Sequence, residues 1–437
     1  GAIETGDLAK LSSSQLQALS AKQVQAFSTA QLNGLSTTQI QSFTAKQVAG
    51  FSTAQVASLS TDNVKALTST QVKGLTADQL KAMTSGQIAV LDTEDIAVLT
   101  DKQIKGISTG NIVALTTGQA SVLTDKQLKA FSADQIKAIE TEDLAQLGTN
   151  AIKGLSATQI GALTSGQVTA FTTAQAAALS YAQIAGLTTA NIKGLEAVDL
   201  EKISTAAIKG LQATAVGGIS TDAIAKLSSS HISAFSDAQV KAFTTDQAGK
   251  LTSAQAAGLT AANIKGLETA DLAQLSTDAI AGLSASSISA FSADQVKAFT
   301  AAQAEKLTSA QVAGLTATNI KGLETADLEK LSTTAIAGLS ASSIGALSSD
   351  QVKAFTAAQA EKLTSAQVAG LTATNIKGLE TADMVKITDT AIKGLTTAAI
   401  QALDNKGNVT ASQITALKTA YTTTQLSGWG FTTDQLA

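Results

Sequence analysis

The feature that most constrains this chain is an eight-residue pattern that recurs without a slip from Leu11 to Leu403, over 49 intervals. In the octad Leu363 to Gly370 (LTSAQVAG), labelled a to h, positions a and f are apolar, b is Ser or Thr and e is Gln. The same frame fits nearly every octad. Repetition at a fixed period indicates one quasi-linear repeat array rather than several globular cores.

Each octad contains the signals that begin and end a short helix. Ser or Thr at b with Gln at e is the capping box S/T-x-x-Q, and the apolar a and f residues form the hydrophobic staple that accompanies it. Acids gather at c and d and lysines at g, as the helix dipole favours. Position h is often glycine, which predicts a left-handed residue closing the helix. These glycines include Gly74, Gly106, Gly154, Gly194, Gly266, Gly322 and Gly378.

Two other arrangements fit the pattern less well. In one long helix, each octad would rotate the a/f stripe by about 80°, so the stripe would not stay buried. In a β-solenoid, a and f would face opposite sides of a strand. The sequence therefore predicts an all-α fold, an α-solenoid (superhelix) of very short helices, one per octad. Because helices this short are unstable alone, we expect them to stack. Two or three helices in each layer would make a rod, but the number per layer does not follow from the sequence.

A longer copy is superimposed on the octads. Residues 259–314 and 315–370 align over their full length with seven differences. The related copy that begins at Leu187 contains two extra octads, residues 211–226, which keep the phase. The octad is therefore the unit by which this chain lengthens.

The frame fails after Leu403, where Asp404 to Asn408 is turn-like. We predict an octapeptide-repeat α-solenoid over residues 1–403, and an irregular C-terminal cap or a hinge to a further domain over residues 404–437. The chain starts without Met and ends on a nearly full frame, so we expect a segment of a longer or processed polypeptide. Three aromatic residues crowd this end, either as packing of the cap or as an interaction surface: Tyr421, Trp429 and Phe431.

Composition excludes several classes of site. The chain has no cysteine, so disulfides and thiolate metal sites are absent. The formal net charge of −4 is spread in single charges, so we expect no nucleic-acid partner. No apolar run is long enough to span a membrane.

One carboxylate pattern recurs at b and e. Carboxylates three residues apart could share a Ca²⁺ ion, which binds six to eight oxygens. Alternatively, one variant octad was copied with its module, and its acids suit a helix start. We favour the copied octad and predict no metal and no cofactor, with Ca²⁺ as the alternative. The candidates are Glu268, Asp271, Glu324, Asp327, Glu380 and Asp383, with earlier copies at Glu140, Asp143, Glu196 and Asp199.

No catalytic constellation emerges. His231, the only histidine, occupies an e position and reads as a replacement for the capping glutamine. Asn408 to Thr410 matches a glycosylation sequon, which is a weak signal alone. We therefore expect no enzymatic activity.

The Leu-Thr-x-x-Gln element of the octad is similar to the motif that names the Spy/CpxP periplasmic chaperones. That motif lies within long helices there, so the chaperone function does not carry over. The chain as a whole resembles long, Ala/Thr/Ser-rich tandem-repeat proteins of bacterial cell surfaces, including secreted adhesins and surface-layer or sheath components. That resemblance implies an extracellular, cell-surface structural part but no site residues.

These observations give two functional hypotheses. The first is a non-enzymatic structural protein, a stalk, spacer or self-assembling filament or surface scaffold that associates with itself or with other surface components. The alternative is a binding module, in which one solenoid face recognises a glycan, a protein or a mineral surface.

Overall fold

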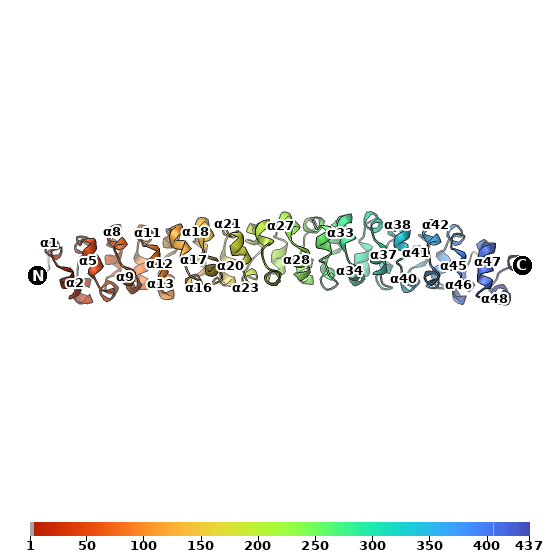
Figure 1. Ribbon diagram of the computed structural model, residues 1–437, viewed down its shortest axis with the longest axis horizontal. Coiled ribbons are helices and arrows are strands. Elements are labelled where there is room, and N and C mark those ends of the chain that lie inside the picture. The colour runs from red at the N-terminus through yellow and green to blue at the C-terminus, as the bar shows by residue number, and fades with distance from the viewer. Residues whose placement is uncertain (1–3, 405) are drawn as a thin grey trace. The chain divides into compact units, whose positions relative to one another are not determined.

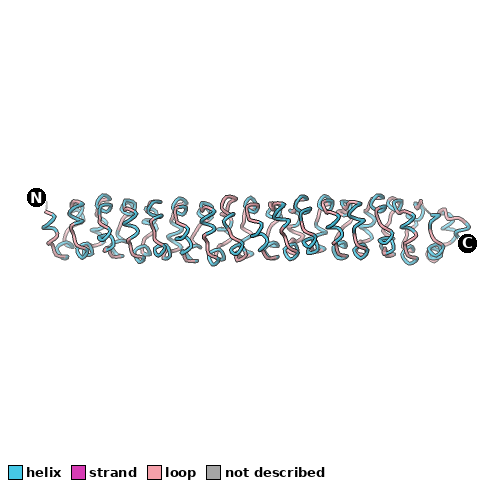
Figure 2. The backbone as a smooth tube through the Cα atoms, turned by 90° about the horizontal axis from the view of Figure 1, so that it is seen from above, coloured by secondary structure: helices cyan, strands magenta, loops and turns pink. Residues whose placement is uncertain are grey.

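A computed structural model describes residues 4–404 and 406–437, and the chain forms two compact units, Gly1–Ile219 and Ser220–Ala437. All regular structure in these described residues is helical, in 49 α-helices and five 3-10 helices (Figure 1). Within each unit, short helices alternate with short loops along a winding backbone, one helix for each octad (Figure 2). The predicted all-α solenoid of very short helices is therefore confirmed.

The first unit holds α1 to α26 and one 3-10 helix. Its first half contains α1 (Thr5–Leu8), α2 (Ser13–Gln17), α3 (Ala21–Gln25), α4 (Thr29–Asn33), α5 (Thr37–Ser42), α6 (Ala45–Ala49), α7 (Thr53–Ser58), α8 (Thr61–Lys65), α9 (Ser69–Gly74), α10 (Ala77–Ala82), α11 (Ser85–Ala89), α12 (Thr93–Ala97) and α13 (Asp101–Gly106). Its second half contains α14 (Thr109–Val113), α15 (Thr117–Ser121), α16 (Asp125–Ala130), α17 (Ala133–Lys137), α18 (Thr141–Gln146), α19 (Thr149–Ile152), α20 (Ala157–Ala162), α21 (Ser165–Thr169), α22 (Thr173–Ala177), α23 (Tyr181–Ile184), η1 (Ile192–Gly194), α24 (Ala197–Leu200), α25 (Thr205–Ile208) and α26 (Ala213–Val216).

The second unit continues the same series. Its first half contains α27 (Thr221–Lys226), α28 (Ser229–Ala234), α29 (Asp237–Lys241), α30 (Thr245–Gly249), α31 (Ser253–Ala256), η2 (Ile264–Gly266), α32 (Thr269–Gln274), α33 (Thr277–Gly282), α34 (Ala285–Ala290), α35 (Ala293–Lys297), α36 (Ala301–Glu305) and α37 (Ser309–Ala313). Its second half contains η3 (Ile320–Gly322), α38 (Thr325–Lys330), α39 (Thr333–Ile336), α40 (Ala341–Ala346), α41 (Ser349–Lys353), α42 (Ala357–Glu361), α43 (Ser365–Val368), η4 (Asn375–Gly378), α44 (Thr381–Met384), α45 (Asp389–Ile392), α46 (Thr397–Ala402), η5 (Lys406–Asn408), α47 (Ala411–Lys418), α48 (Thr423–Gly428) and α49 (Thr433–Leu436).

The capping box predicted from the octad begins most of these helices. At α41, Ser348 is extended (φ −73°, ψ 165°), its hydroxyl accepts from the Gln351 N–H, and the Gln351 side chain accepts from the Ser348 N–H. Each cap satisfies backbone donors that a helix start leaves free. A helix therefore begins one residue after b and runs for only four to six residues in most octads.

The glycines at h do not close helices in the left-handed conformation, so that prediction was wrong. Among the described residues only Gly430 has a positive φ, of 99°. At Gly106 and Gly322 a Cβ would instead collide with the backbone carbonyl of a c residue one turn back, Ala77 and Ala293 respectively. Glycine is required there because two backbones approach closely.

The core is built from a and f, as the staple pattern predicts. The f side chains are fully buried, such as Val352 at 0% exposure, and the a side chains nearly so. Consecutive a residues face each other across this core: the rings of Phe291 and Phe299 meet edge to face at 5.8 Å. Two units of thin, continuous core result.

Most helices pack on the third helical element after them when the 3-10 helices are counted, for example α6 on α9, and α36 on α38 with α37 and η3 between them. Side chains at e reach further back, to residues 28 and 31 positions earlier. One turn of the solenoid therefore holds between three and four octads, a number that the sequence left open.

The segment after Leu403 keeps part of the repeat logic. Thr410 and Gln413 form a capping box at the start of α47, which at eight residues is longer than the octad helices. The assignment of residues 404–437 as a cap or hinge stays a prediction, and Asn405 lies outside the described residues.

Candidate functional site

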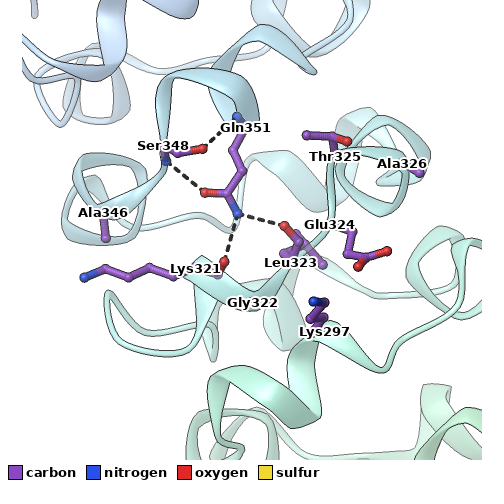
Figure 3. Close-up of a pocket in the computed structure, with 10 residues that line it drawn as sticks. All are labelled: Lys297, Lys321, Gly322, Leu323, Glu324, Thr325, Ala326, Ala346, Ser348 and Gln351. Carbon is purple, nitrogen blue, oxygen red and sulfur yellow. Dashed lines mark hydrogen bonds between the residues drawn. The ribbon is translucent and has the colours of Figure 1, made fainter.

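The side chain at position e has two sets of hydrogen bonds, and Gln351 shows both (Figure 3). Its Oε1 accepts from the Ser348 N–H at 2.8 Å, which completes the capping box. Its Nε2 donates to the carbonyls of Ile320 at 3.1 Å and Leu323 at 2.7 Å, one turn back. The buried amide thus caps its own helix and ties it to the preceding turn.

The same geometry recurs along both units, and we call it the e-position ladder. A typical Gln step donates to the f carbonyl 31 residues back and the a carbonyl 28 residues back, as Gln47 does to Leu16 at 2.8 Å and Leu19 at 2.7 Å. Buried carbonyls need a donor, and the ladder supplies it. Sequence reasoning recognised the capping role of Gln and missed the second one.

A signal for the missed role was present. A capping box accepts Glu or Gln at its last position, yet no octad between Leu11 and Leu403 has Glu at e. Glutamate can cap but cannot donate. The absence of Glu therefore indicates that most e side chains also act as donors.

Shorter donors also serve as ladder steps. Asn319 donates from Nδ2 to the carbonyls of Ile288 at 2.9 Å and Phe291 at 3.2 Å, in an octad whose helix is the 3-10 helix η3. Ser287 donates its hydroxyl to the Leu259 carbonyl at 2.5 Å. Side chains as short as these reach the same carbonyls.

Six steps of the ladder are aspartates, which we call the acidic steps: Asp95, Asp143, Asp199, Asp271, Asp327 and Asp383. All are buried, with between 2% and 5% exposure. The Oδ2 atoms of Asp143, Asp271 and Asp327 are fully buried and have no hydrogen-bond partner. These carboxylates occupy the place where other octads put an N–H donor.

Burial raises the pKa of several acidic steps. For Asp271, Asp327 and Asp383 the pKa rises to about 6, mainly through desolvation and then through the charge of the Glu at b. Burial likewise raises the pKa of Asp143 to about 6, with further contributions from Glu140 and Glu142.

Asp95 and Asp199 differ because a hydroxyl from the preceding turn reaches each. Burial raises both pKa values, and side-chain hydrogen bonds from Ser69 to Asp95 and from Thr173 to Asp199 lower them in part. The residue 26 positions before Asp327 is Ala301, which has no hydroxyl. The equivalent residues for Asp143 and Asp271 are Thr117 and Thr245, yet the Oδ2 atoms of these two aspartates have no hydrogen-bond partner.

The paired glutamates lie in a different environment from the aspartates. Glu268, Glu324 and Glu380 are exposed N-cap residues whose side chains make no cap hydrogen bond. Glu380 forms an exposed ion pair with Lys353 at 3.4 Å. Within the described residues no three acidic or histidine side chains gather as a metal site, and the buried and exposed members of each pair do not form an oxygen cage. The prediction of no metal stays a prediction.

A solvent-open hollow of about 650 Å³ lies beside the ladder step at Gln351 (Figure 3). Lys297, Lys321 and Glu324 supply its charged lining. A second hollow of about 660 Å³ occurs one module earlier, with Lys241, Lys265 and Glu268 in the equivalent positions. The 56-residue module therefore repeats a surface feature as well as a sequence.

The aromatic residues of the C-terminal segment pack on the protein. Tyr421 and Trp429 meet edge to face with ring centroids 5.1 Å apart, and the Tyr421 hydroxyl donates to the Leu395 carbonyl at 2.5 Å. Phe431 is 3% exposed. The structure brings Tyr421 and Trp429 together and buries Phe431, and the role of the three as an interaction surface stays a prediction.

His231 occupies the position of a capping glutamine, as the sequence predicted. Its backbone N–H donates to the Ser228 hydroxyl at 3.2 Å, and the ring Nδ1 accepts from the Ser228 N–H at 3.2 Å.

No helix in the described part of the chain has the length and apolarity needed to cross a bilayer.

Comparison with known families identifies repeats of one kind in both units. Segments match the model of the ALTTAQ repeat family, whose name corresponds to positions h to e of the octad. No curated protein matches the chain. The matches show a tandem-repeat protein, and the resemblance to adhesins and surface-layer proteins stays a prediction. The matching segments are residues 1–37, 29–61, 47–77, 61–93, 136–173, 264–301 and 320–357, a little under half of the chain.

Proposed function

We propose that this tandem-repeat protein is a non-enzymatic structural part, an extracellular stalk, spacer or self-assembling scaffold of a bacterial cell surface. The observation that carries the proposal is the e-position ladder. Positions a and f of each octad build the core, and the e side chain joins successive turns. These inward positions are therefore used for cohesion along the solenoid.

The outer positions support the same proposal. Positions b, c, d and g carry mostly Ser, Thr, Ala and single Lys or Asp residues. The few ion pairs found among described residues are exposed, as between Lys362 and Glu361 at 3.1 Å, and such pairs contribute little to stability. A surface of short side chains over a regular ladder suits a spacer whose length matters more than any one residue.

Electron microscopy and sedimentation velocity of the purified chain, over a concentration series, test the scaffold. Concentration-dependent growth into ordered filaments or sheets supports self-assembly. If the particles do not associate, single-molecule force measurements follow. Resistance to mechanical extension up to high force supports a stalk or spacer. Particles that neither associate nor resist extension contradict the proposal.

The repeated hollow favours a second candidate, a binding module. Two hollows one module apart present the same pair of lysines and the same glutamate, an arrangement that suits a repeating anionic ligand such as an acidic glycan. Binding of an acidic polysaccharide that weakens in the Lys297→Ala/Lys321→Ala variant supports this function. The control is Lys362→Ala, which removes an exposed lysine outside the hollows. If the double variant binds the polysaccharide as well as this control does, these hollows are not the binding site.

A further inference from the structure

The ladder contains steps where a buried carboxylate stands in the place of an N–H donor. At Gln and Asn steps an N–H group points at the carbonyls of the preceding turn. At Asp143, Asp271 and Asp327 that place holds a buried Oδ2 with no partner. An ionised carboxylate can only accept, whereas a protonated one has an O–H to donate.

The register of the ladder identifies the carbonyls concerned. Asn319 donates to Ile288 and Phe291. Eight residues further on, the same register places Asp327 opposite the carbonyls of Val296 and Phe299. Asn319 belongs to a 3-10 octad, but Asn111 lies in the α-helix α14 and donates to the Met83 carbonyl 28 residues back at 2.8 Å. Asp and Asn side chains have the same length, so an aspartate in an α-helical octad reaches the carbonyl 28 residues back. Among the described residues no hydrogen bond reaches the Phe299 carbonyl.

We propose that Asp143, Asp271 and Asp327 are proton-operated latches between successive turns of the solenoid. In the closed latch, the protonated carboxyl donates its O–H to a backbone carbonyl one turn back. In the open latch, the carboxylate has released its proton to solvent and the two acceptors repel each other. Only the carboxyl O–H bond and this hydrogen bond change. Ser287 shows that a single hydroxyl donor suffices for such a step.

The surroundings of Asp327 raise its pKa toward neutral pH and so favour its protonated form. On its own helix Glu324 adds to the effect of burial, and the pKa rises to about 6. The charged residues of α38 and of the two helices packed on it, α36 and α41, are Glu324, Glu329, Lys330, Glu305, Asp350 and Lys353, with Lys306 at the end of α36. Of these charged residues, only Glu324 contributes to the rise in the Asp327 pKa, in addition to burial.

The other two latches have similar surroundings. Asp271 in α32 faces Glu268 on its own helix, and burial and Glu268 raise its pKa to about 6. The helices packed on α32 are α30 and α35, whose charged residues are Asp246, Lys250, Asp294 and Lys297. The helices packed on α18, which holds Asp143, are α15 and α21, and neither contains a charged residue.

A bound cation is the other species that could join two acceptors. A Ca²⁺ ion binds six to eight oxygens, whereas each latch offers one unpartnered carboxylate oxygen, and no three acidic or histidine side chains gather in the described part of the chain. The proton is therefore the preferred partner. These latches join successive turns of the solenoid, whether the chain serves as a scaffold or as a binding module.

The test compares the full chain with the triple variant Asp143→Asn/Asp271→Asn/Asp327→Asn, in which each latch has a permanent N–H donor. Urea unfolding midpoints are measured at pH 5 and pH 8 in EDTA. We expect the variant to gain over the wild type at pH 8 and to gain much less at pH 5. A matched control, Asp294→Asn, changes an exposed aspartate of α35 and should shift both midpoints equally.

Two results overturn the proposal. If the triple variant raises the urea midpoint equally at both pH values, the effect of the aspartates does not depend on their protonation. A gain by the wild type at pH 8 on adding Ca²⁺ or Na⁺, absent from the triple variant, would show that a cation closes the latch. Carboxyl carbon NMR of the wild type gives a readout independent of the variant's folding. Titration of the three latch aspartates near pH 6, alongside Asp383, supports the latches, and titration of all aspartates near the ordinary value of about 4 rejects them.

Discussion

At the scale of single residues, the chemistry of the amide explains the choice of glutamine at e. The capping box needs an acceptor, and the ladder needs donors for two carbonyls one turn back. Of the uncharged side chains, only Asn and Gln carry an acceptor and two donors on one group. The identity of this residue is therefore set by contacts with two parts of the chain at once.

Replacing Gln351 by Glu keeps the cap acceptor and removes the ladder donors. The carbonyls of Ile320 and Leu323 then lose their partner and a carboxylate is buried, which we expect to cost on the order of 3 kcal/mol at pH 8. The measurement is urea unfolding followed by circular dichroism.

Gln23 provides the matched control for this substitution. It makes the same capping box with Ser20, but its side chain is exposed. Gln23→Glu should change stability by less than about 0.5 kcal/mol, as surface substitutions usually do. Equal losses for the two variants would mean that capping, and not the ladder, makes glutamine necessary.

The glycine at h makes a second residue-scale prediction. A Cβ at Gly322 would meet the backbone of Ala293, so Gly322→Ala should destabilise by about 1–3 kcal/mol through overpacking. Gly110 in α14 has no atom closer than 4.0 Å to such a Cβ, and Gly110→Ala should stabilise by about 0.5–1 kcal/mol. Thermal unfolding of both variants checks the opposite signs.

How far the sequence could predict these residues depends on the range of their contacts. The cap between Ser348 and Gln351 is local, so spacing alone predicted it. The contact of Gly322 with Ala293 is made 29 residues away, and local rules therefore assigned its glycine to a helix end. The second role of Gln351 was likewise hidden, although the exclusion of Glu from e hinted at it.

At the scale of the element, the octad carries both a helix and a fixed set of partners one turn back. A helix of four to six residues is unstable alone, so its stability comes from the helices stacked on it. Every e residue lies opposite the a residue 28 positions earlier and the f residue 31 positions earlier. Any change in length that is a multiple of eight therefore preserves this matching.

Deleting residues 331–338 removes one octad, whose e residue is Ala335 and gives no ladder bond. We expect unchanged helical circular dichroism per residue and a melting temperature within a few degrees of the wild type. Deleting only residues 331–334 puts e opposite the wrong positions. That variant should lose protection from hydrogen exchange in the helices stacked on α38 and α40. Equal tolerance of both deletions would argue against the octad as the structural unit.

At the scale of the whole molecule, the sequence predicted the all-helical solenoid but not the number of octads in a turn. Period and capping are visible in every octad, whereas the turn length depends on how closely successive backbones approach. Gly322 and the e-position ladder set that approach. Contacts between helices three octads apart make each turn depend mainly on its immediate neighbours.

Nearest-neighbour cohesion predicts how two ladder substitutions combine. Gln351 in α41 and Asn375 in η4 lie on elements packed directly on each other, so Gln351→Glu and Asn375→Asp should couple by about 0.5–3 kcal/mol in a double-mutant cycle. Gln255 in α31 packs on other helices of the same unit, and Gln255→Glu should add to Gln351→Glu within about 0.5 kcal/mol. Hydrogen exchange of the α41 amides measures both cycles as local opening free energies. Equal coupling of the near and remote pairs would contradict nearest-neighbour cohesion and show that the unit unfolds as one cooperative body.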